Sequence, residues 1–204
     1  AVGASNAATP AGPARGALYV YVFNGSTWTQ RQKLYDPLGA AGDAFGFSVA
    51  IHVTTIAIGA PRADPSGVAD AGVVLTGIVA PPFAPSVVLT RYAQAVPLAD
   101  SWLGHSVAVH LGLVAAGAPH DPTRGFIAGS VQICHGGTSP LEPVYLSGGN
   151  DWDSFGTSLT WANDLLVVGA PFIDTTQAAG AGQACFFRFF PDGTHLELSR
   201  VQAS

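Results

Sequence analysis

Six histidines and thirteen carboxylates are the side chains of this chain that could act in catalysis or bind a metal. The histidines show neither His-x-x-His nor Cys-x-x-His spacing, which argues against a zinc site. Glu142 and Glu197 are the only glutamates, and both fall in expected outer strands, so a glycosidase acid–base pair has little support. Neither a Gly-x-Ser-x-Gly elbow nor a phosphate-binding loop ending in Lys-Ser/Thr is present. The sequence therefore predicts no catalytic residues, no cofactor and no enzyme activity; an active site assembled from loop Asp and His is the alternative.

The aspartates recur at fixed places relative to repeated glycines. Asp43 and Asp153 lie three residues before such a glycine. Three others follow a Gly-Ala-Pro tripeptide by two or three residues: Asp64, Asp121 and Asp174. This recurrence indicates a structural duty, because short Asp side chains accept hydrogen bonds from nearby backbone N–H groups. The pair Asp151 and Asp153 supplies only two carboxylates, too few for a cation site.

Three stretches of the chain share one pattern. GFSVAIHVTTIAIGAP begins at Gly46, GHSVAVHLGLVAAGAP at Gly104 and GTSLTWANDLLVVGAP at Gly156. In each, 13 positions separate the first glycine from the glycine of Gly-Ala-Pro, whereas the stretches start 58 and 52 positions apart. A constant internal spacing with a variable outer spacing predicts a rigid repeated unit joined by loops of variable length.

Two further runs follow each Gly-Ala-Pro position, and VGAS at Val2–Ser5 takes that position ahead of the first full stretch. A run opened by glycine starts at Gly16, Gly72, Gly129 and Gly182. A more polar run closes the unit and starts at Trp28, Pro85, Leu141 and His195. All are short, rich in Val, Ile, Phe, Tyr and Thr, and bounded by turn-forming residues, as strands are. Four strands in a unit of about 50 residues are typical of a β-propeller blade.

This pattern resembles the FG-GAP repeat of integrin α-subunit propellers. The first stretch keeps Phe45-Gly46 and Gly59-Ala60-Pro61, the second has Leu103-Gly104, and the third keeps Phe155-Gly156. The resemblance implies an all-β fold of integrin-like β-propeller blades, each with four antiparallel strands. The glycine lets the inner strand crowd toward the propeller axis, and the Phe or Leu beside it plugs the gap between blades.

About four blades are expected, with approximate limits at residues 1–38, 39–96, 97–148 and 149–204. Only Ala1 precedes Val2-Gly3 in this sequence, so we expect the first blade to lack its inner strand and these residues to form fifteen strands. FG-GAP propellers usually close with around seven blades, and open blade edges expose unpaired backbone. We therefore expect a part of a larger ring, completed by further blades or by another copy of the chain. The lack of methionine also indicates a piece of a longer polypeptide.

Several integrin-type repeats hold Ca²⁺ in an Asp-rich loop between the first two strands, and this chain has no room for such a loop. Two strands of five or six residues leave only short turns within the 13-residue spacing: 52–54, 110–112 and 162–164. A calcium loop needs roughly nine to twelve residues with several oxygen ligands. We therefore expect no metal in these hairpins.

In integrins the ligand binds the propeller face that carries the loops between second and third strands and the loops between blades. The first kind spans residues 5–15, 61–71, 119–128 and 171–181 here. The resemblance and the variety of these loops nominate seven residues as ligand contacts: Arg62, Asp64, His120, Asp121, Arg124, Phe172 and Asp174. Trp102 and Trp152 either stack on a ligand or plug blade junctions, and we favour plugging.

The composition narrows the range of partners. The net charge is -5 and the chain has one lysine, which argues against nucleic acid and anionic membranes as partners, and its apolar runs are too short for membrane insertion. Cys134 and Cys185 lie in apolar runs, where buried free thiols are expected rather than a disulfide. Asn24-Gly25-Ser26 is either a plain hairpin turn or an N-glycosylation site.

The resemblance and the lack of a catalytic constellation predict a non-catalytic adhesion or recognition module. Such a module would belong to a secreted or cell-surface protein and would bind a protein or a glycan. Three alternatives remain: a structural scaffold repeat within a larger assembly, a carbohydrate-binding lectin, and an accessory domain beside an enzyme.

Overall fold

The computed structural model describes residues 1–79, 87–135, 142–144, 150–175, 178–190 and 194–202. Within these residues the chain forms fifteen β-strands and one short 3₁₀ turn, Pro65–Gly67. The strands make four antiparallel sheets, which we call blades 1 to 4 in chain order. No helix in the described part of the chain is long and apolar enough to cross a membrane.

The blades follow one another along the sequence. Blade 1 contains β1 (Val2–Ala4), β2 (Ala17–Phe23) and β3 (Trp28–Leu34). Blade 2 contains β4 (Ser48–His52), β5 (Thr55–Ala60), β6 (Val73–Ile78) and β7 (Thr90–Tyr92). Blade 3 contains β8 (Ser106–His110), β9 (Leu113–Ala118), β10 (Ser130–His135) and β11 (Glu142–Val144). Blade 4 contains β12 (Ser158–Ala162), β13 (Leu165–Ala170), β14 (Gln183–Phe189) and β15 (His195–Gln202).

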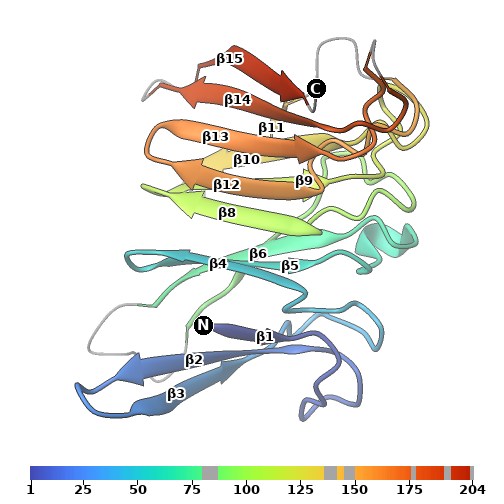
Figure 1. Cartoon of the computed structure of the whole chain (residues 1–204). Helices are drawn as coiled ribbons and strands as arrows, with labels where there is room; N and C mark the ends of the chain where they lie inside the picture. The colour runs from blue at the N-terminus through green and yellow to red at the C-terminus, as the bar shows by residue number, and fades with distance from the viewer. Residues whose placement is uncertain (80–86, 136–141, 145–149, 176–177, 191–193, 203–204) are drawn as a thin grey trace.

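The predicted architecture is confirmed. One sheet has three strands and the other three have four, each in sequence order from the inner to the outer strand, and the three-stranded sheet is blade 1. Among the described residues, blade 1 thus has no strand at the place that β4 takes in blade 2. The four sheets lie one above another in chain order, from β1–β3 at the bottom to β12–β15 at the top (Figure 1).

The inner hairpins of blades 2, 3 and 4 have the same register. Ser48 pairs with Gly59, Ser106 with Gly117, and Ser158 with Gly169, each serine lying two residues after the first glycine of its repeat. Each hairpin turn is two residues long rather than the three expected at 52–54, 110–112 and 162–164, because His52, His110 and Ala162 still pair within the first strand. Each turn starts with a left-handed residue: Val53, Leu111 and Asn163. The 13-residue spacing therefore fixes both the register and the short turn.

The junction between blades 2 and 3 is built from three groups. The Ser48 hydroxyl donates a hydrogen bond to the Gly104 carbonyl oxygen at 2.7 Å. A Cβ on Gly59 would overlap that same oxygen, so glycine is required by the close approach of the two blades. Gly72, which precedes β6, pairs with Leu103 in an isolated parallel bridge.

The junction between blades 3 and 4 repeats these groups. The Ser106 hydroxyl donates to the Gly156 carbonyl oxygen at 2.7 Å, a Cβ on Gly117 would overlap that oxygen, and Gly129 pairs with Phe155. Serine and glycine at the same repeat positions thus make the same contacts at both junctions, with Leu103 in one and Phe155 in the other as the apolar partner. Blades 1 and 2 share the glycine and bridge contacts but not the serine, because blade 1 has no inner strand.

Apolar side chains fill the space between neighbouring blades. Phe45, Leu103 and Phe155 are fully buried, and each belongs to the core cluster between its own blade and the one before it. They are the residues that plug the junctions, as the repeat pattern predicts. Burying a side chain of this size contributes about 1.5–3 kcal/mol, so each of these three residues contributes on that scale to the adhesion between blades.

Candidate binding face

The loops between second and third strands and the loops between blades form one end of the stack, which we call the loop face. Backbone hydrogen bonds hold the two kinds of loop together. Leu103 N donates to Ala71 O at 3.1 Å, and Phe155 N donates to Ala128 O at 3.0 Å one blade further on. The loop face is therefore a set of loops fixed to one another through the main chain rather than a set of independent segments.

Asp43 and Asp153 hold the loops that lead into blades 2 and 4. The Asp43 carboxylate accepts a hydrogen bond from Ala40 N, and the Asp153 carboxylate accepts one from Asn150 N, both at 2.8 Å. Both side chains are buried, and this burial raises the pKa of each carboxyl above its ordinary value. The recurrence of Asp at this position therefore reflects turn capping, as expected.

Asp64 and Asp174 cap the loops between second and third strands. The Asp64 carboxylate accepts from Asp70 N and the Asp174 carboxylate from Gly180 N, both at 2.8 Å and both across six residues. Asp64 and Asp174 play the same part in blades 2 and 4. One oxygen of each exposed carboxylate caps the loop, and the other is left for a ligand.

Asp121 differs from these two because it is buried at 1% exposure. Its carboxylate accepts hydrogen bonds from Ser130 Oγ at 2.6 Å, Gln94 Nε2 at 3.1 Å and Thr123 N at 2.9 Å. These three donors occupy both oxygens, so Asp121 fixes the base of the loop face.

Trp102 lies between two histidine rings. Its ring centroid is 3.9 Å from that of His120 and 6.1 Å from that of His105, and both pairs are stacked. Phe47 continues the row, with its ring centroid 5.1 Å from His105. The structure thus brings the predicted residues Trp102 and His120 together and adds two that the sequence analysis did not single out. Phe47 and His105 share one repeat position, directly after the first glycine, and that position was the available signal.

Burial changes the pKa of the two histidines of this row, His105 and His120. Loss of hydration lowers the pKa of His105 and of His120, and the neighbouring His105 lowers that of His120 further. Trp102 Nε1 and His105 Nδ1 are buried atoms with no hydrogen-bond partner among the described residues. The imidazole rings of His105 and His120 are therefore uncharged near neutral pH and stack as neutral aromatic groups.

Trp152 does not plug a blade junction, and the expectation that it would do so is wrong. Its side chain is 58% exposed and packs edge-on against Phe126, itself 57% exposed, with ring centroids 4.8 Å apart. Asp151 steadies the pair by accepting a hydrogen bond from Phe126 N at 2.7 Å. The buried Phe155 fills the junction instead, because it lies next to the repeat glycine whereas Trp152 lies four residues before it.

The remaining predicted contacts lie at equivalent places in different blades. Arg62, His120 and Phe172 each directly follow a Gly-Ala-Pro proline, and Arg62 and Phe172 are exposed. Arg124 is exposed on the corresponding loop of blade 3. Asn24 lies elsewhere, in the β2–β3 hairpin, where its side-chain oxygen accepts from Ser26 N and Thr27 N, so a hairpin turn is present and glycosylation stays a prediction.

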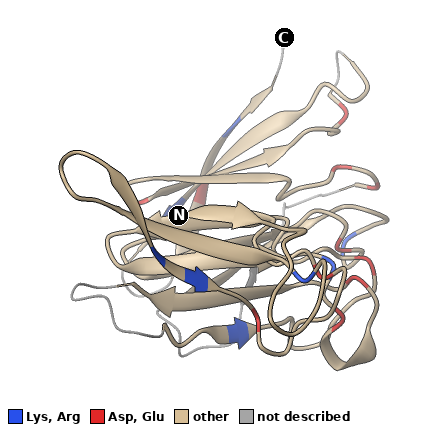
Figure 2. Ribbon diagram, turned by 90° about the horizontal axis from the view of Figure 1, so that it is seen from below, with Lys and Arg blue, Asp and Glu red and all other residues tan. Residues whose placement is uncertain are grey.

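Acidic residues concentrate on the loop face. Nine of the thirteen lie in its loops: Asp36, Asp43, Asp64, Asp70, Asp100, Asp121, Asp151, Asp153 and Asp174. Three of the eight basic residues lie there as well: Arg15, Arg62 and Arg124. The formal charge of this face is therefore 3 − 9 = −6, against -5 for the whole chain. Figure 2 shows most of the acidic segments on the loops at one end of the sheets.

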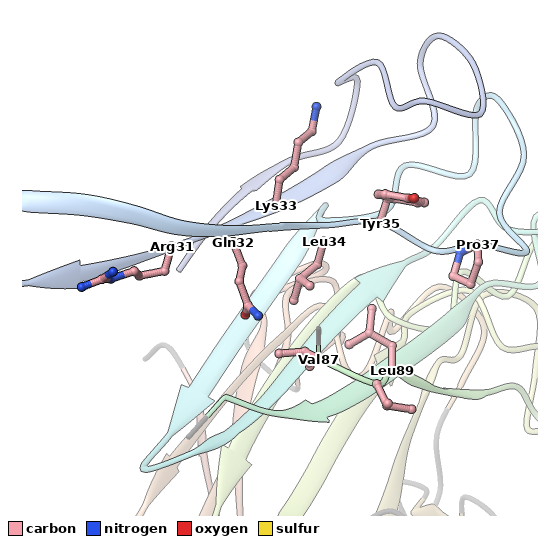
Figure 3. Close-up of a pocket in the computed structure, with 9 residues that line it drawn as sticks. Arg31, Gln32, Lys33, Leu34, Tyr35, Pro37, Val87 and Leu89 are labelled. Carbon is pink, nitrogen blue, oxygen red and sulfur yellow. The ribbon is translucent and has the colours of Figure 1, made fainter. Parts of the chain in front are cut away.

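Two cavities of the described chain lie away from the loop face. One, of about 570 Å³, runs along the outer edge of blades 1 and 2, where Gln32 and Leu34 point toward Val87 and Leu89 (Figure 3). The other, of about 520 Å³, lies at the hairpin turns of blades 3 and 4. It is lined by His110, Leu111, Leu113, Trp161, Asp164, Phe189 and Phe190.

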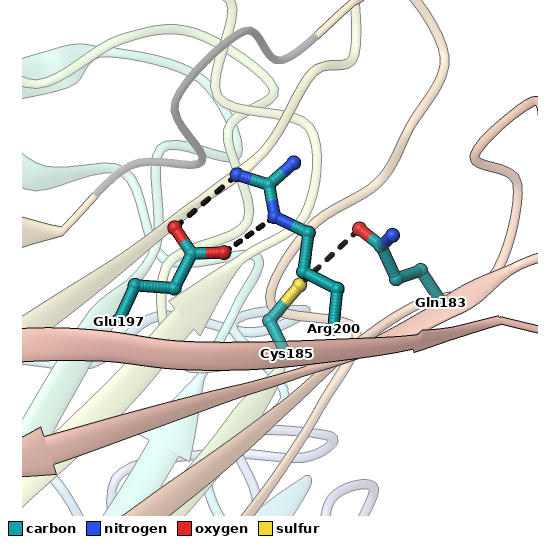
Figure 4. A network of polar contacts seen from close by, with 4 residues as sticks. All are labelled: Gln183, Cys185, Glu197 and Arg200. Atoms are coloured by element: carbon teal, nitrogen blue, oxygen red, sulfur yellow. Dashed lines mark hydrogen bonds and ion pairs between the residues drawn. The ribbon is translucent and has the colours of Figure 1, made fainter.

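Both cysteines are buried and free, as expected. Burial raises the pKa of the Cys134 and Cys185 thiols to about 11. The Cys185 thiol donates to Gln183 Oε1 at 3.4 Å, beside the ion pair of Glu197 and Arg200 (Figure 4). Thiols in such surroundings stay protonated and unreactive near neutral pH. In the part of the chain that the structure describes, no group of three or more His, Cys, Asp or Glu could hold a metal ion.

Comparison with known families agrees with the repeat pattern. Residues 28–74 match the FG-GAP repeat family, and this match runs from the start of β3 through β4 and β5 into β6. No curated protein matches the chain. The same serine–glycine register recurs in blades 3 and 4, outside the matched residues. The resemblance is therefore confirmed: this chain carries an FG-GAP repeat at residues 28–74.

Proposed function

We propose that the chain is a non-catalytic recognition module of an extracellular or cell-surface protein, and that it binds a protein ligand through the loop face. One observation carries this proposal: exposed aromatic rings and four exposed aspartates meet on loops that are fixed by main-chain hydrogen bonds, the aspartates being Asp64, Asp100, Asp151 and Asp174. A rigid scaffold that carries varied loops is where binding residues concentrate in proteins.

The chemistry of the face favours a basic partner. Carboxylates such as Asp64 and Asp174 each have an oxygen outside their capping bond, and a negative surface attracts and orients positive ligands over distances near the Debye length. Trp152 and Phe126 present exposed ring surface beside them, on which a Lys or Arg side chain gains about 0.5–1 kcal/mol through a cation–π contact. A protein surface rich in Lys and Arg meets both conditions.

A glycan is the second candidate, because the exposed Trp152–Phe126 pair also offers ring surface to the apolar face of a sugar. A neutral glycan would use the rings and the hydrogen-bonding Asp oxygens but not the net charge. Dependence of binding on salt separates the two candidates, since only a charged partner is weakened by screening.

The test compares two exposed aromatic pairs at opposite ends of the sheets. Trp152→Ala removes half of the pair on the loop face, and Trp28→Ala removes half of the Phe23–Trp28 pair on the β2–β3 hairpin, whose ring centroids are 5.2 Å apart. Binding of the purified chain to an immobilised lysine-rich peptide is measured by surface plasmon resonance at several salt concentrations, and a glycan array is probed in parallel.

We expect binding to the peptide that weakens as salt rises, about threefold or more loss with Trp152→Ala, and no change with Trp28→Ala. Salt-insensitive binding to a sugar that Trp152→Ala abolishes would assign the face to a glycan instead. Equal effects of the two substitutions would refute the loop face as the binding surface.

A further inference from the structure

The cavity at the hairpin turns of blades 3 and 4, where β8 and β12 end away from the loop face, is lined by a tryptophan that the repeat does not require (Figure 1). Trp161 lies five residues after Gly156, and Val109 lies five residues after Gly104. Both hold the same place in the register of their hairpins. Val109 is buried in its own junction, so a valine is enough to pack this position, and the blade architecture does not account for the larger indole of Trp161.

The junction of blades 2 and 3 is closed at this end, whereas the junction of blades 3 and 4 is open. His52 Nδ1 accepts a hydrogen bond from Leu111 N at 3.2 Å, and the ring centroids of His52 and His110 are 4.8 Å apart. His110 and Asn163 hold the corresponding places one blade further on, and within the described residues no hydrogen bond joins them. A cavity of about 520 Å³ lies there instead, within the range of about 300–1,000 Å³ that is typical of small-ligand sites.

The aromatic rings of this cavity are held in place by their neighbours. Trp161 stacks on His110, with ring centroids 5.9 Å apart and planes 28° apart. Phe189 lies between Trp161 and His195, with a centroid distance of 5.3 Å to each. The planes of Trp161 and Phe189 meet at 68°, so these two rings form a corner rather than a flat stack. Because the neighbours already fix both rings, a ligand would have to order few side chains on binding.

The surface of the cavity is mostly ring and aliphatic carbon. Trp161 is half-buried, yet its Nε1 is buried and has no hydrogen-bond partner among the described residues. The accessible part of this side chain is therefore the carbon surface of the indole. Phe190 and Leu111 add exposed apolar surface to the lining.

Asp164 is the one formally charged residue among those that line the cavity in the described part of the chain. Its Oδ2 lies 2.9 Å from Arg188 Nε in an ion pair, and both side chains are partly exposed. Within the described residues, Oδ1 has no such contact. Asp164 thus places a negative charge beside the ring surface, and Arg188 is the cation that now neutralises it.

We propose that this cavity binds an organic cation whose nitrogen carries methyl groups, such as a trimethylammonium group. The faces of aromatic rings attract cations, and Asp164 adds an opposite charge. A primary ammonium would need acceptors for its three N–H groups, whereas the polar lining is one carboxylate and one imidazole. Methyl groups need no such acceptors and pack on the rings and leucines.

The same lining argues against two other classes of ligand. A sugar has several hydroxyls, and the polar groups of Asp164 and His110 are too few to bind them. An anion would be repelled by Asp164. The inference concerns the end of the sheets opposite the loop face, and it does not depend on the proposed function.

Choline is the probe, and 3,3-dimethylbutan-1-ol, in which carbon replaces the charged nitrogen, is its matched control. Each is titrated into the ¹⁵N-labelled 204-residue chain and followed by NMR at the indole N–H of Trp161, one of four tryptophans. The signal that Trp161→Val removes identifies it. We expect saturable shifts with choline and at least about fivefold weaker binding of the neutral alcohol, because only the cation is attracted by the rings and the carboxylate.

Four variants of the chain locate the site. Trp161→Val installs the residue that packs this position in blade 3, so the chain should stay folded. Its choline binding, followed at the Leu113 amide, should weaken about fivefold or more. Asp164→Asn should weaken binding severalfold, whereas Arg188→Gln should strengthen it severalfold, because the guanidinium no longer competes for the carboxylate. Trp28→Ala removes an exposed ring from the β2–β3 hairpin and should change nothing. Circular dichroism and urea unfolding check that each variant is folded.

Four results would overturn the proposal. The first is the absence of saturable shifts up to about 10 mM choline, and saturation by methyl glucoside in its place would assign the cavity to a sugar. The second is equal binding of choline and the neutral alcohol, which would make the cavity merely apolar. The third is unchanged choline binding by the folded Trp161→Val variant. The fourth is weaker binding by Arg188→Gln, which would show that the arginine rather than Asp164 holds the ligand.

Discussion

Gly117 lies where blade 3 meets blade 4, and one methyl group at this position tests how the blades adhere. Its backbone has an ordinary negative φ, so alanine fits the strand itself. The added Cβ would overlap the carbonyl oxygen of Gly156 in the next blade and crowd the Ser106 hydroxyl. Relief requires the two blades to move apart, because the colliding atom is backbone and cannot rotate away.

The cost can be worked from the contacts. Overpacking of this kind costs about 1–3 kcal/mol, and loss of the Ser106–Gly156 hydrogen bond at 2.7 Å costs about 0.5–1.5 kcal/mol more. Replacing glycine by alanine also raises the free energy of unfolding by about 0.4–1 kcal/mol, because alanine restricts the unfolded chain. Gly117→Ala should therefore lower the free energy of unfolding by about 0.5–4 kcal/mol.

Gly169→Ala is the matched control, at the same repeat position in blade 4. Its Cβ would meet only the Ser158 hydroxyl, which can rotate, and no described residue of another blade. We expect its free energy of unfolding to lie within about 1 kcal/mol of the unmodified chain.

Urea unfolding of the three proteins, followed by circular dichroism, measures the difference. Blades of a repeat array can unfold separately, so hydrogen exchange of the blade 4 amides should accompany the urea curves. If Gly117→Ala and Gly169→Ala have the same midpoint, the serine–glycine contact does not hold the blades together, and the reasoning on the junctions is refuted.

Three further predictions concern the core, the histidines and the thiols. Phe155→Ala should lower the free energy of unfolding by about 3–5 kcal/mol, because a fully buried ring between two blades is lost; a loss below 1 kcal/mol in urea unfolding would contradict its role as a plug. Burial lowers the pKa of His105 and His120 in the folded chain. As the pH falls, these histidines therefore take up protons in the unfolded chain before they do so in the folded chain. The stability that they contribute is complete above about pH 6.5 and is lost below it. Urea midpoints from pH 7.5 to 5 should fall less steeply in a variant with both histidines changed to Gln, and parallel curves would count against this. Cys134 and Cys185 should not react with Ellman's reagent at pH 7.5 in the folded chain and should both react in 6 M guanidinium, since each thiol is buried with a pKa of about 11; rapid reaction of the folded chain would show that the blades open.

The sequence alone determined the inner hairpins. The expected starts of two outer strands, Pro85 and Leu141, lie outside the described residues, and the described strands there are β7 (Thr90–Tyr92) and β11 (Glu142–Val144). The spacing from Gly46 to Gly59 leaves room for only a short turn between two five- or six-residue strands, so local geometry determines that a tight hairpin forms, although its exact two-residue length is seen only in the structure. The residue types of the junction are equally local: glycine where backbones meet, and Phe45 beside it as an apolar plug. Because the repeat carries these constraints within a single unit, three copies predicted three equal blades and a first blade without its inner strand.

Only the tertiary structure decided which side chains meet on the loop face. Trp102 and Trp152 look alike in sequence, yet one lies between two histidines and the other packs on Phe126 in solvent. Trp102 has a left-handed φ of 58° two residues before the repeat glycine, and Trp152 one of 74° four residues before it, so the loop aims them differently. Phe126, the partner of Trp152, belongs to a loop of the preceding blade, and no spacing within one repeat specifies a contact across two.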